Sequence, residues 1–464
     1  MSSESDSFRT ETDSLGTVKV PAHALYGAQT QRAVNNFTLS GILMPRAFLR
    51  ALGLIKAGYA TANAQAGALS ERTAAAIVAA AESVADGSYD NHFPVEVFQT
   101  GSATSSNMNA NEVIATLAAR ATGADVHPND DVNHGQSSND VIPSCLHLAS
   151  ALLVVERLIP ALEHLQRTLE NRETELDQVV KTGRTHLMDA LPITFAQEMS
   201  GWRAQLALCQ QRLEGTLPRL QQLALGGTAV GSGVNALPGS AAAVCEWLTQ
   251  RTGVRFRVAD NHFAAMSAQD TAVELSGQLR VLAVALIKIA NDLRWGGSGP
   301  LAGLGEWVLP ELQPGSSIMP GKVNPVIPEA VVMAGYQVIG NDTAVTLGGQ
   351  SGSFQLNVAL PLIIHNLVQS IELTTNAAVL LADKVLVGLT VNVDAAAAKV
   401  ARNPILVTAL NNQIGYDLGA RIAKQAYAEG RAVIDVAAEL TDLDRETLEQ
   451  LLDPLRLCRP EREN

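Results

Sequence analysis

The segment NDVIPSCLHLASALLVVERLIPALEHLQRTLENRETELDQVV (Asn139–Val180) is one continuous run in which apolar side chains recur at helical spacing. Two prolines, Pro143 and Pro160, are its only interruptions. The run is longer than an ordinary globular helix of about 8–20 residues, and such length is typical of helices in a bundle. The segment therefore predicts a mostly helical fold.

The same pattern returns further along the chain. It marks four more long stretches: Phe195–Leu225, Ala264–Trp295, Pro328–Leu347 and Val358–Leu386. An irregular entry with a small hairpin near Thr17–Val20 is expected before Pro45, and shorter helices are expected after Asn392. The long stretches place the helical core in the middle of the chain.

The composition agrees with closely packed helices. The chain has 464 residues, of which 47% are hydrophobic but only 4% aromatic, and Ala and Leu are strong helix formers. At roughly 150 residues per domain, this length suggests three domains. Part of the apolar surface is expected to lie between subunits.

Charge and hydropathy exclude two classes of partner. The net charge of −13 argues against nucleic acid, which requires a basic surface. No apolar run is expected to reach the roughly 18 residues of a membrane span, because Asp383 and Lys384 break the best candidate at Ala377–Val391. Met1–Asp6 has neither the basic nor the apolar part of a signal peptide.

The cysteines indicate a reducing compartment. They are far apart and form no CxxC pair: Cys145, Cys209, Cys245 and Cys458. Buried free thiols are therefore expected rather than disulfides or a metal site, and a cytoplasmic location follows.

Four polar segments between the helices are rich in Ser, Thr and Asn but carry few charges. They are Thr100–Asn111, His127–Asp140, Lys181–Asp189 and Pro314–Pro325. Ordinary helix caps and turns account for any one of them. Together, with two His-containing segments and a Lys in a third, they indicate a site for a polar ligand.

The known cofactor motifs do not fit these segments. Gly315–Lys322 has five residues between its glycines, and Val323 replaces the magnesium-binding Ser or Thr of a phosphate loop. The Gly231-Ser232-Gly233 stretch lacks the third glycine of a dinucleotide site. HExxH and GxSxG patterns are missing. A site without cofactor or metal is therefore favoured.

Two of the segments carry candidate reactive groups. Lys322 is the only cation in Pro314–Pro325 and is suited to a carboxylate, although most lysines lie on the surface. His186 is a candidate acid or base, and a carboxylate such as Glu329 would orient its imidazole. The sequence alone leaves their contact open.

Five blocks, in their family order, make the chain similar to the fumarase/aspartase superfamily. The loop GSSIMPGKVNP (Gly315–Pro325) resembles the superfamily loop. The other blocks are TGSATSSNMNANEV (Thr100–Val113), HPNDDVN (His127–Asn133), QSSND (Gln136–Asp140) and GRTHLMDA (Gly183–Ala190). The likeness runs from about Phe8 to Pro454 and is greatest to the class II fumarases.

This resemblance implies an architecture. It implies an N-terminal domain (1–136), a central helical-bundle domain (137–392) and a small C-terminal helical domain (393–464). It also implies a homotetramer with a core of twenty helices, in which three subunits build each active site. No cofactor is implied.

The resemblance further implies reversible, stereospecific hydration of fumarate to (S)-malate in the tricarboxylic acid cycle. Ser316 would be the base on a flexible loop, and His186, paired with Glu329, would be the second acid/base group, acting through a water. The implied substrate-binding residues are Ser102, Ala103, Thr104, Ser137, Ser138, Asn139, Thr185, Ser317, Lys322, Val323 and Asn324. A second dicarboxylate site would comprise His127, Pro128, Asn129 and Asp130.

Two alternatives within the superfamily remain. Aspartate ammonia-lyases have Gln in place of His186, and hydroxide benefits more than ammonium from a proton donor when it leaves. An inactive structural member would have lost catalytic positions, whereas this chain keeps them. Two departures are Ala103, where Gly is usual, and Ala124-Asp125, where an Arg of the second site is often found.

Overall fold

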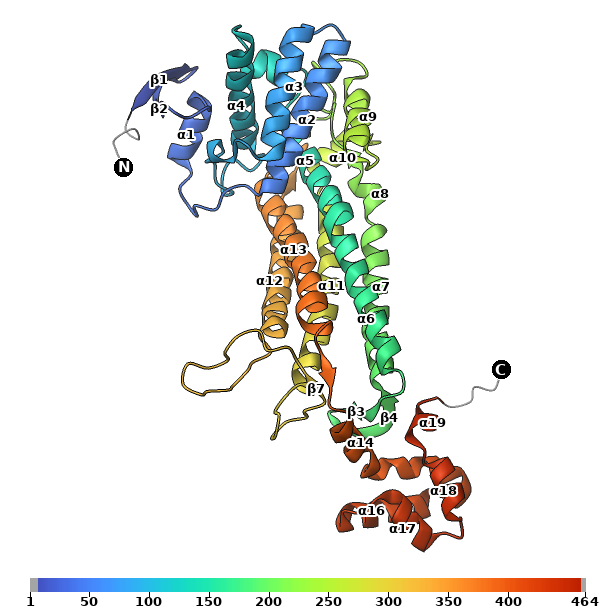
Figure 1. The fold of residues 1–464 in the computed structure, drawn as a ribbon. Helices are drawn as coiled ribbons and strands as arrows, with labels where there is room; N and C mark the ends of the chain where they lie inside the picture. The colour runs from blue at the N-terminus through green and yellow to red at the C-terminus, as the bar shows by residue number, and fades with distance from the viewer. Residues whose placement is uncertain (1–6, 460–464) are drawn as a thin grey trace. The chain divides into compact units, whose positions relative to one another are not determined.

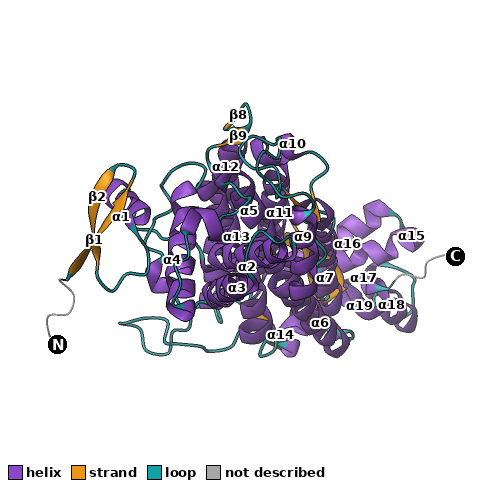
Figure 2. Cartoon of the chain, turned by 90° about the horizontal axis from the view of Figure 1, so that it is seen from above, coloured by secondary structure: helices purple, strands orange, loops and turns teal. Residues whose placement is uncertain are grey.

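The computed structural model describes residues 7–459, and their regular structure is dominated by helices (Figure 2). In this part of the chain the strands form five two-stranded pairs. The predicted mostly helical fold is confirmed. Residues 1–6, for which the sequence predicts no signal peptide, lie outside the described part.

The longer helices match the predicted stretches closely. The helices are α1 (Ala28–Asn36), α2 (Arg46–Gln65), α3 (Glu71–Asp86), α4 (Thr104–Thr122), α5 (Ser138–Leu153), α6 (Ile159–Leu176), α7 (Phe195–Glu214), α8 (Leu217–Leu220), α9 (Ser240–Thr252), α10 (His262–Ser267), α11 (Asp270–Gly296), α12 (Val326–Gly349), α13 (Leu360–Leu380), α14 (Val393–Ala401), α15 (Asn411–Ile414), α16 (Tyr416–Glu429), α17 (Val433–Leu440), α18 (Arg445–Leu451) and α19 (Pro454–Cys458). Short π-helical turns extend α5 (Val154–Leu158) and α13 (Leu381–Leu386). A third lies before α5 (Pro128–Val132).

The strands are short and pair locally. They are β1 (Phe8–Asp13), β2 (Gly16–Pro21), β3 (Val180–Thr185), β4 (Met188–Thr194), β5 (Gln222–Leu223), β6 (Arg257–Val258), β7 (Trp307–Val308), β8 (Gly352–Ser353), β9 (Leu356–Asn357) and β10 (Thr390–Val391). The β5–β6 pair is parallel and the others are antiparallel. The hairpin β1–β2, which pairs Phe8 with Pro21, confirms the predicted N-terminal hairpin.

The chain folds as two compact units. Among the described residues, unit 1 comprises 7–160, 210–283 and 335–375, and unit 2 comprises 161–209, 284–334 and 376–459. The three domains implied by the resemblance stay a prediction.

In unit 1, small residues let the helices approach closely. Helix α2 lies beside α3, with α4 next to α3 (Figure 1). Gly53 of α2 faces α3 so closely that a Cβ there would lie 2.6 Å from the backbone oxygen of Ala81. Helix α12 is tied to α13 by Asn341, whose amide donates to Gln369 Oε1 (2.9 Å) and Ser370 Oγ (3.1 Å). Close packing of this kind explains a core with few aromatic rings.

In unit 2, polar contacts join the long helices around an apolar interior. Arg203 of α7 makes a two-pronged ion pair with Glu173 of α6 at 2.8 and 2.9 Å. On α7, Trp202 donates to Asp292 of α11 at 3.1 Å. The C-terminal helices enclose a core of their own that includes Leu410, Ile422 and Val436.

The prediction that no apolar run reaches the length of a membrane span was wrong. The helical run Ser138–Leu176 is long and apolar enough, by length and composition, to cross a membrane. Its most apolar window is 67% buried inside the structure, and the core helix of a globular protein has the same composition. All four cysteines are buried and outside any disulfide, as predicted.

Candidate active site

The loop Gly315–Pro325 is closed by its own hydrogen bonds. The amide of Gly315 donates to the backbone oxygen of Lys322 (2.7 Å), and Asn324 Nδ2 donates to the backbone oxygen of Gly315 (2.8 Å). A Cβ on Gly315 would lie 2.6 Å from that Lys322 oxygen, so the loop requires glycine here. Lys322 Nζ donates to Asn324 Oδ1 at 2.6 Å. The loop therefore holds a cation and an amide side by side.

Ser316 has a distinctive environment within this loop. Its Oγ accepts hydrogen bonds from the amides of Ile318 (3.2 Å) and Met319 (3.0 Å). Two donors on one oxygen stabilise negative charge there. Ser316 is half-buried, whereas the neighbouring Ser317 is exposed. The geometry suits Ser316 to act as a base.

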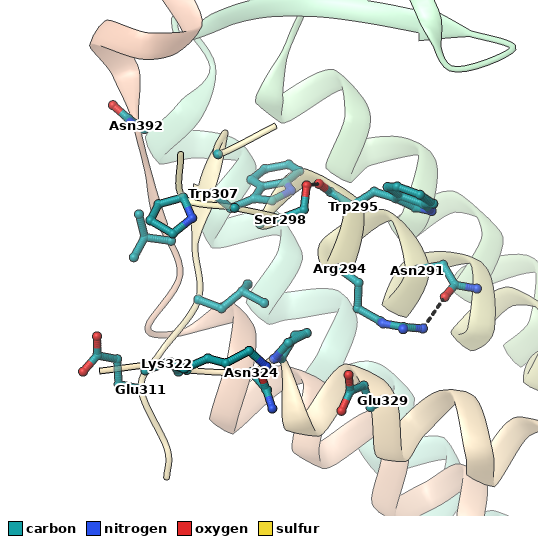
Figure 3. Close-up of a pocket in the computed structure, with 18 of the residues that line it drawn as sticks. Asn291, Arg294, Trp295, Ser298, Trp307, Glu311, Lys322, Asn324, Glu329 and Asn392 are labelled. Carbon is teal, nitrogen blue, oxygen red and sulfur yellow. Dashed lines mark hydrogen bonds between the residues drawn. The ribbon is translucent and has the colours of Figure 1, made fainter. Parts of the chain in front are cut away.

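A pocket of about 830 Å³ in unit 2 collects part of the predicted site. Lys322, Val323, Asn324 and Glu329 line it, with Glu329 in the first turn of α12 (Figure 3).

Helix α11 contributes Asn291 and Arg294 to the same pocket, joined by a 3.1 Å hydrogen bond (Figure 3). Neither residue stands out in the sequence, because both lie within an apolar run. The available signal was a cation and an amide, three positions apart, inside that run.

His186 lies at the tip of the hairpin β3–β4. Thr185 pairs with Met188, so His186 and Leu187 alone form the turn. Their φ angles of 55° and 61° are both left-handed, as a tight hairpin turn requires. Thr185 and His186 are consequently exposed.

Within one chain, no hydrogen bond or ion pair among residues 7–459 joins His186 to Glu329. Their pairing stays a prediction about an assembly in which subunits share each site.

Ser102 and Thr104 lie at the start of α4, with their hydroxyl oxygens 2.9 Å apart. Between them, Ala103 is fully buried and has a left-handed φ of 54°. A glycine at that position would be free of this strain. The Ala found here in place of the usual Gly therefore has an energetic cost. Before them, Gly101 lies against Val358, whose oxygen would be 1.8 Å from any Cβ.

The start of α5 is a capping box that arranges Ser137, Ser138 and Asn139. Ser137 Oγ accepts from the amide of Asn139 (3.2 Å), and the amide of Ser137 donates to Asp140 Oδ1 (3.0 Å). Asn139 Nδ2 donates to the oxygen of Ala229 at 2.8 Å. The N-terminus of this helix favours an anion such as a carboxylate.

Asp140 fixes the capping box from inside the protein. Its other oxygen accepts from the amides of Gly226 (3.0 Å) and Thr228 (2.9 Å). Burial raises the pKa of Asp140 above its usual value, although these amides oppose the shift.

Lys56 was also missed, because it lies inside the apolar pattern of α2. It is fully buried, and its Nζ donates to Asn133 Oδ1 and Gln136 Oε1, both at 2.9 Å. Burial lowers the pKa of Lys56 to about 7. Asn107 donates both to Asn133 (3.1 Å) and to Ser138 Oγ (3.3 Å), so a buried network leads from Lys56 to the predicted site.

Three of the four residues predicted for the second site line another pocket, of about 890 Å³, in unit 1. His127, Pro128 and Asn129 line it, together with Arg9 and Arg120. His127 Nδ1 accepts from the amide of Asp130 at 3.1 Å, and the Asp130 side chain is 83% exposed. Ligand binding at this pocket stays a prediction. In residues 7–459 no three His, Cys, Asp or Glu side chains are grouped to hold a metal ion.

Comparison with known proteins identifies the family. A lyase family profile matches residues 16–340, and a profile for the C-terminus of fumarase C matches residues 406–459. A class II fumarate hydratase of Xylella fastidiosa is 58% identical over 98% of this chain and 96% of its own length. The chain belongs to the class II fumarate hydratase family.

Other family members are similar over nearly the same length. The class II fumarate hydratase of Mycobacterium tuberculosis is 50% identical over 99% of this chain and 98% of its own. The crystal structure of a class II fumarase from Schistosoma mansoni superposes with a TM-score of 0.94 at 37% identity, covering 98% of this chain and 100% of that one. Family membership therefore extends to both units.

Proposed function

We propose that this protein catalyses the reversible, stereospecific hydration of fumarate to (S)-malate. The observation that carries the proposal is the loop Gly315–Pro325. In this loop, which its own hydrogen bonds close, the Ser316 hydroxyl accepts from two backbone amides. The same loop carries the cation Lys322 and the side-chain amide of Asn324. Family membership over nearly the whole chain supports the same reaction.

In the dehydration direction, Ser316 acts as its alkoxide, which has lost its hydroxyl proton to solvent and whose charge the amides of Ile318 and Met319 stabilise. The alkoxide removes the proton from C3 of malate and becomes a neutral hydroxyl. The electron pair of the broken C–H bond moves into the adjacent carboxylate, which gains a second negative charge. Lys322, Asn324 and the loop amides stabilise that charge, which is greatest near the transition state.

The second step expels the hydroxyl group. The electron pair returns to form the C2–C3 double bond while the C2–O bond breaks. His186 supplies a proton to the departing oxygen through a water, so that water leaves, and Glu329 orients the imidazole. The Ser/Thr/Asn groups at the starts of α4 and α5 hold the substrate carboxylates.

We further propose a homotetramer in which three subunits build each active site. Helix α12 supports this assembly because it is apolar on nearly all sides and several of its apolar side chains are exposed. Met333 is 65% exposed, Tyr336 59% and Leu347 54%. Large exposed apolar surfaces of this kind mark protein–protein contacts.

We place the enzyme in the cytoplasm and in the tricarboxylic acid cycle. Four buried cysteines that form no disulfide in the described part of the chain support a reducing compartment. Fractionation of the source cells, with the protein followed by antibody, tests the location; recovery from an oxidising compartment would contradict it.

A side-by-side assay tests the reaction. Malate and aspartate are supplied separately at neutral pH, and the absorbance of the fumarate double bond is followed. We expect an absorbance rise with malate and none with aspartate. Turnover of aspartate alone would indicate an ammonia-lyase, and turnover of neither would indicate an inactive family member.

A further inference from the structure

Four charged side chains form a largely buried cluster in unit 2, and two of them, Lys181 and Arg184, lie on the hairpin that carries His186. Lys181 Nζ lies 2.8 Å from Glu198 Oε2 and 2.8 Å from Glu306 Oε2. Arg184 contacts both oxygens of Glu306, with Nη1 3.2 Å from Oε2. The side chains of Lys181 and Glu306 are 2% and 1% exposed. Two cations therefore neutralise two carboxylates. Lys181 and Glu306 are shielded from water, whereas Arg184 and Glu198 are partly exposed, at 16% and 23%.

Two aromatic rings pack against the cation at the centre of the cluster. Lys181 Nζ lies 5.1 Å from the centre of the Phe195 ring and 4.9 Å from that of Trp307. These two rings pack edge to face, with centroids 4.8 Å apart. Because buried ion pairs are often no more stabilising than apolar residues of similar volume, stability alone does not account for this arrangement.

The hairpin β3–β4 needs external anchors. A two-stranded hairpin is marginally stable by itself. Its turn is strained, since His186 and Leu187, neither of them glycine, both have left-handed φ angles. Lys181 and Arg184 lie on β3, the strand that ends at Thr185. The cluster therefore holds the strand from which His186 projects.

Glu306 is the fixed point of the cluster. Its amide donates to the oxygen of Gly296 at the end of α11 (2.7 Å), and its own oxygen accepts from the amide of Asn392 (3.0 Å). A Cβ on Gly296 would lie 1.6 Å from Trp307 Nε1, so this junction requires glycine. Glu306 also starts the segment that leads through β7 to the Ser316 loop.

We propose that Glu306 is a positioning residue for the hydration reaction. Through Arg184 and Lys181 it fixes the hairpin that presents His186, and it anchors that hairpin to the segment carrying the Ser316 loop. The inference rests on the role of His186 proposed above.

A double-mutant cycle tests the coupling. Glu306→Gln keeps the shape but removes the charge, and is expected to lower kcat for malate by about tenfold or more. In a His186→Asn background the same change is expected to lower kcat by less than about twofold, because the group it positions is already missing. An equal loss in both backgrounds would overturn the proposal, as would an unchanged kcat for Glu306→Gln alone.

A matched control separates positioning from general loss of a buried ion pair. Glu173→Gln removes a carboxylate that is 14% exposed and receives a similar two-pronged contact from Arg203, but on α6. Its effect on kcat is expected to be the same, and small, in both backgrounds. A loss that matches that of Glu306→Gln and also vanishes with His186→Asn would contradict the proposal.

Hydrogen exchange gives a readout that does not depend on catalysis. Amides of residues 180–194 are expected to exchange faster in Glu306→Gln than in the wild type or in Glu173→Gln. If His186→Asn left kcat unchanged, the role of His186 would fail, whereas unchanged exchange in Glu306→Gln would refute the anchoring itself.

If Glu306→Gln does not fold, Arg184→Lys replaces it, since this variant keeps the charge but loses the forked contact.

Discussion

Two backbone amides point at the hydroxyl oxygen of Ser316, and this contact makes a serine credible as a base. Ser316→Ala is expected to lower kcat by at least about a hundredfold, because the proton acceptor is lost. Steady-state kinetics with malate measure the effect, and thermal unfolding should match that of the wild type. Ser83→Ala, on α3, serves as the control and should change neither quantity. Near-normal turnover by Ser316→Ala would assign the base elsewhere.

Ala103 is a second residue at which local geometry leads to a prediction. It adopts a left-handed φ of 54° at the start of α4, a conformation that costs a residue with a side chain more than it costs glycine. Ala103→Gly is expected to raise the free energy of unfolding by about 0.5–1 kcal/mol.

Ala115→Gly in the same helix is the control for Ala103→Gly. It should lower the free energy of unfolding by about 1 kcal/mol, because glycine is unfavourable in a helix interior. Denaturant unfolding measures both variants, and destabilisation by Ala103→Gly would show that its Cβ contacts outweigh the strain.

At the level of elements, apolar periodicity predicted the long helices well but not their breaks. The expected stretch Phe195–Leu225 ends as α7 at Glu214, because Gly215 and Pro218 follow. Pro160 does not break the run from α5 to α6, because a π-helical turn at Val154–Leu158 precedes it.

The sequence predicts only a polar turn in the segment that forms the hairpin β3–β4. Its turn residues, His186 and Leu187, are not the Asn or Gly that usually mark a tight hairpin. Anchors distant in sequence, such as Glu306, hold it in place, and no local pattern encodes them.

Lys56 links α2 to the segment before α5, and its burial predicts a pH dependence of stability. Its pKa is about 7 in the folded protein and about 10.4 in the unfolded chain. The folded state therefore binds the proton less tightly than the unfolded chain does. The resulting loss of folding free energy is greatest below pH about 7 and disappears above about 10.4. The carboxylate of Asp140 on α5 opposes this shift.

Chemical denaturation of the wild type and Lys56→Met from pH about 7 to 10 measures this linkage. The wild type is expected to gain about 3.5 kcal/mol relative to the variant over this pH range. Lys424→Met, on α16, is the control, and its difference from the wild type should stay flat. A flat difference for Lys56→Met as well would mean that its pKa is not lowered.

At the level of the whole molecule, the sequence predicts candidate site residues but not how they are arranged. The resemblance named Ser316, Lys322 and Asn324, and the structure brings these three into one loop. It also implied that His186 pairs with Glu329, a contact that one described chain does not make. Hydrogen bonds within one loop form between residues that are close in sequence. Contacts between subunits depend on how whole surfaces fit together, and apolar periodicity carries no information about that fit.

Assembly can be tested on helix α12. We expect the purified protein to have a native mass about four times the chain mass of 48.9 kDa. Met333→Glu places a charge on an exposed apolar face and should lower the native mass and the turnover of malate together. Light scattering during gel filtration, with activity assayed across the peak, measures both quantities.

Tyr427→Glu is the matched control for Met333→Glu. Tyr427 is 81% exposed on α16, outside the long helices, so its replacement should preserve both mass and turnover. If each site takes residues from three subunits, dissociation separates Ser316 from the groups it works with, and a lone chain cannot turn over substrate. A fully active monomer of Met333→Glu would therefore refute the shared site, even if the wild type proved tetrameric.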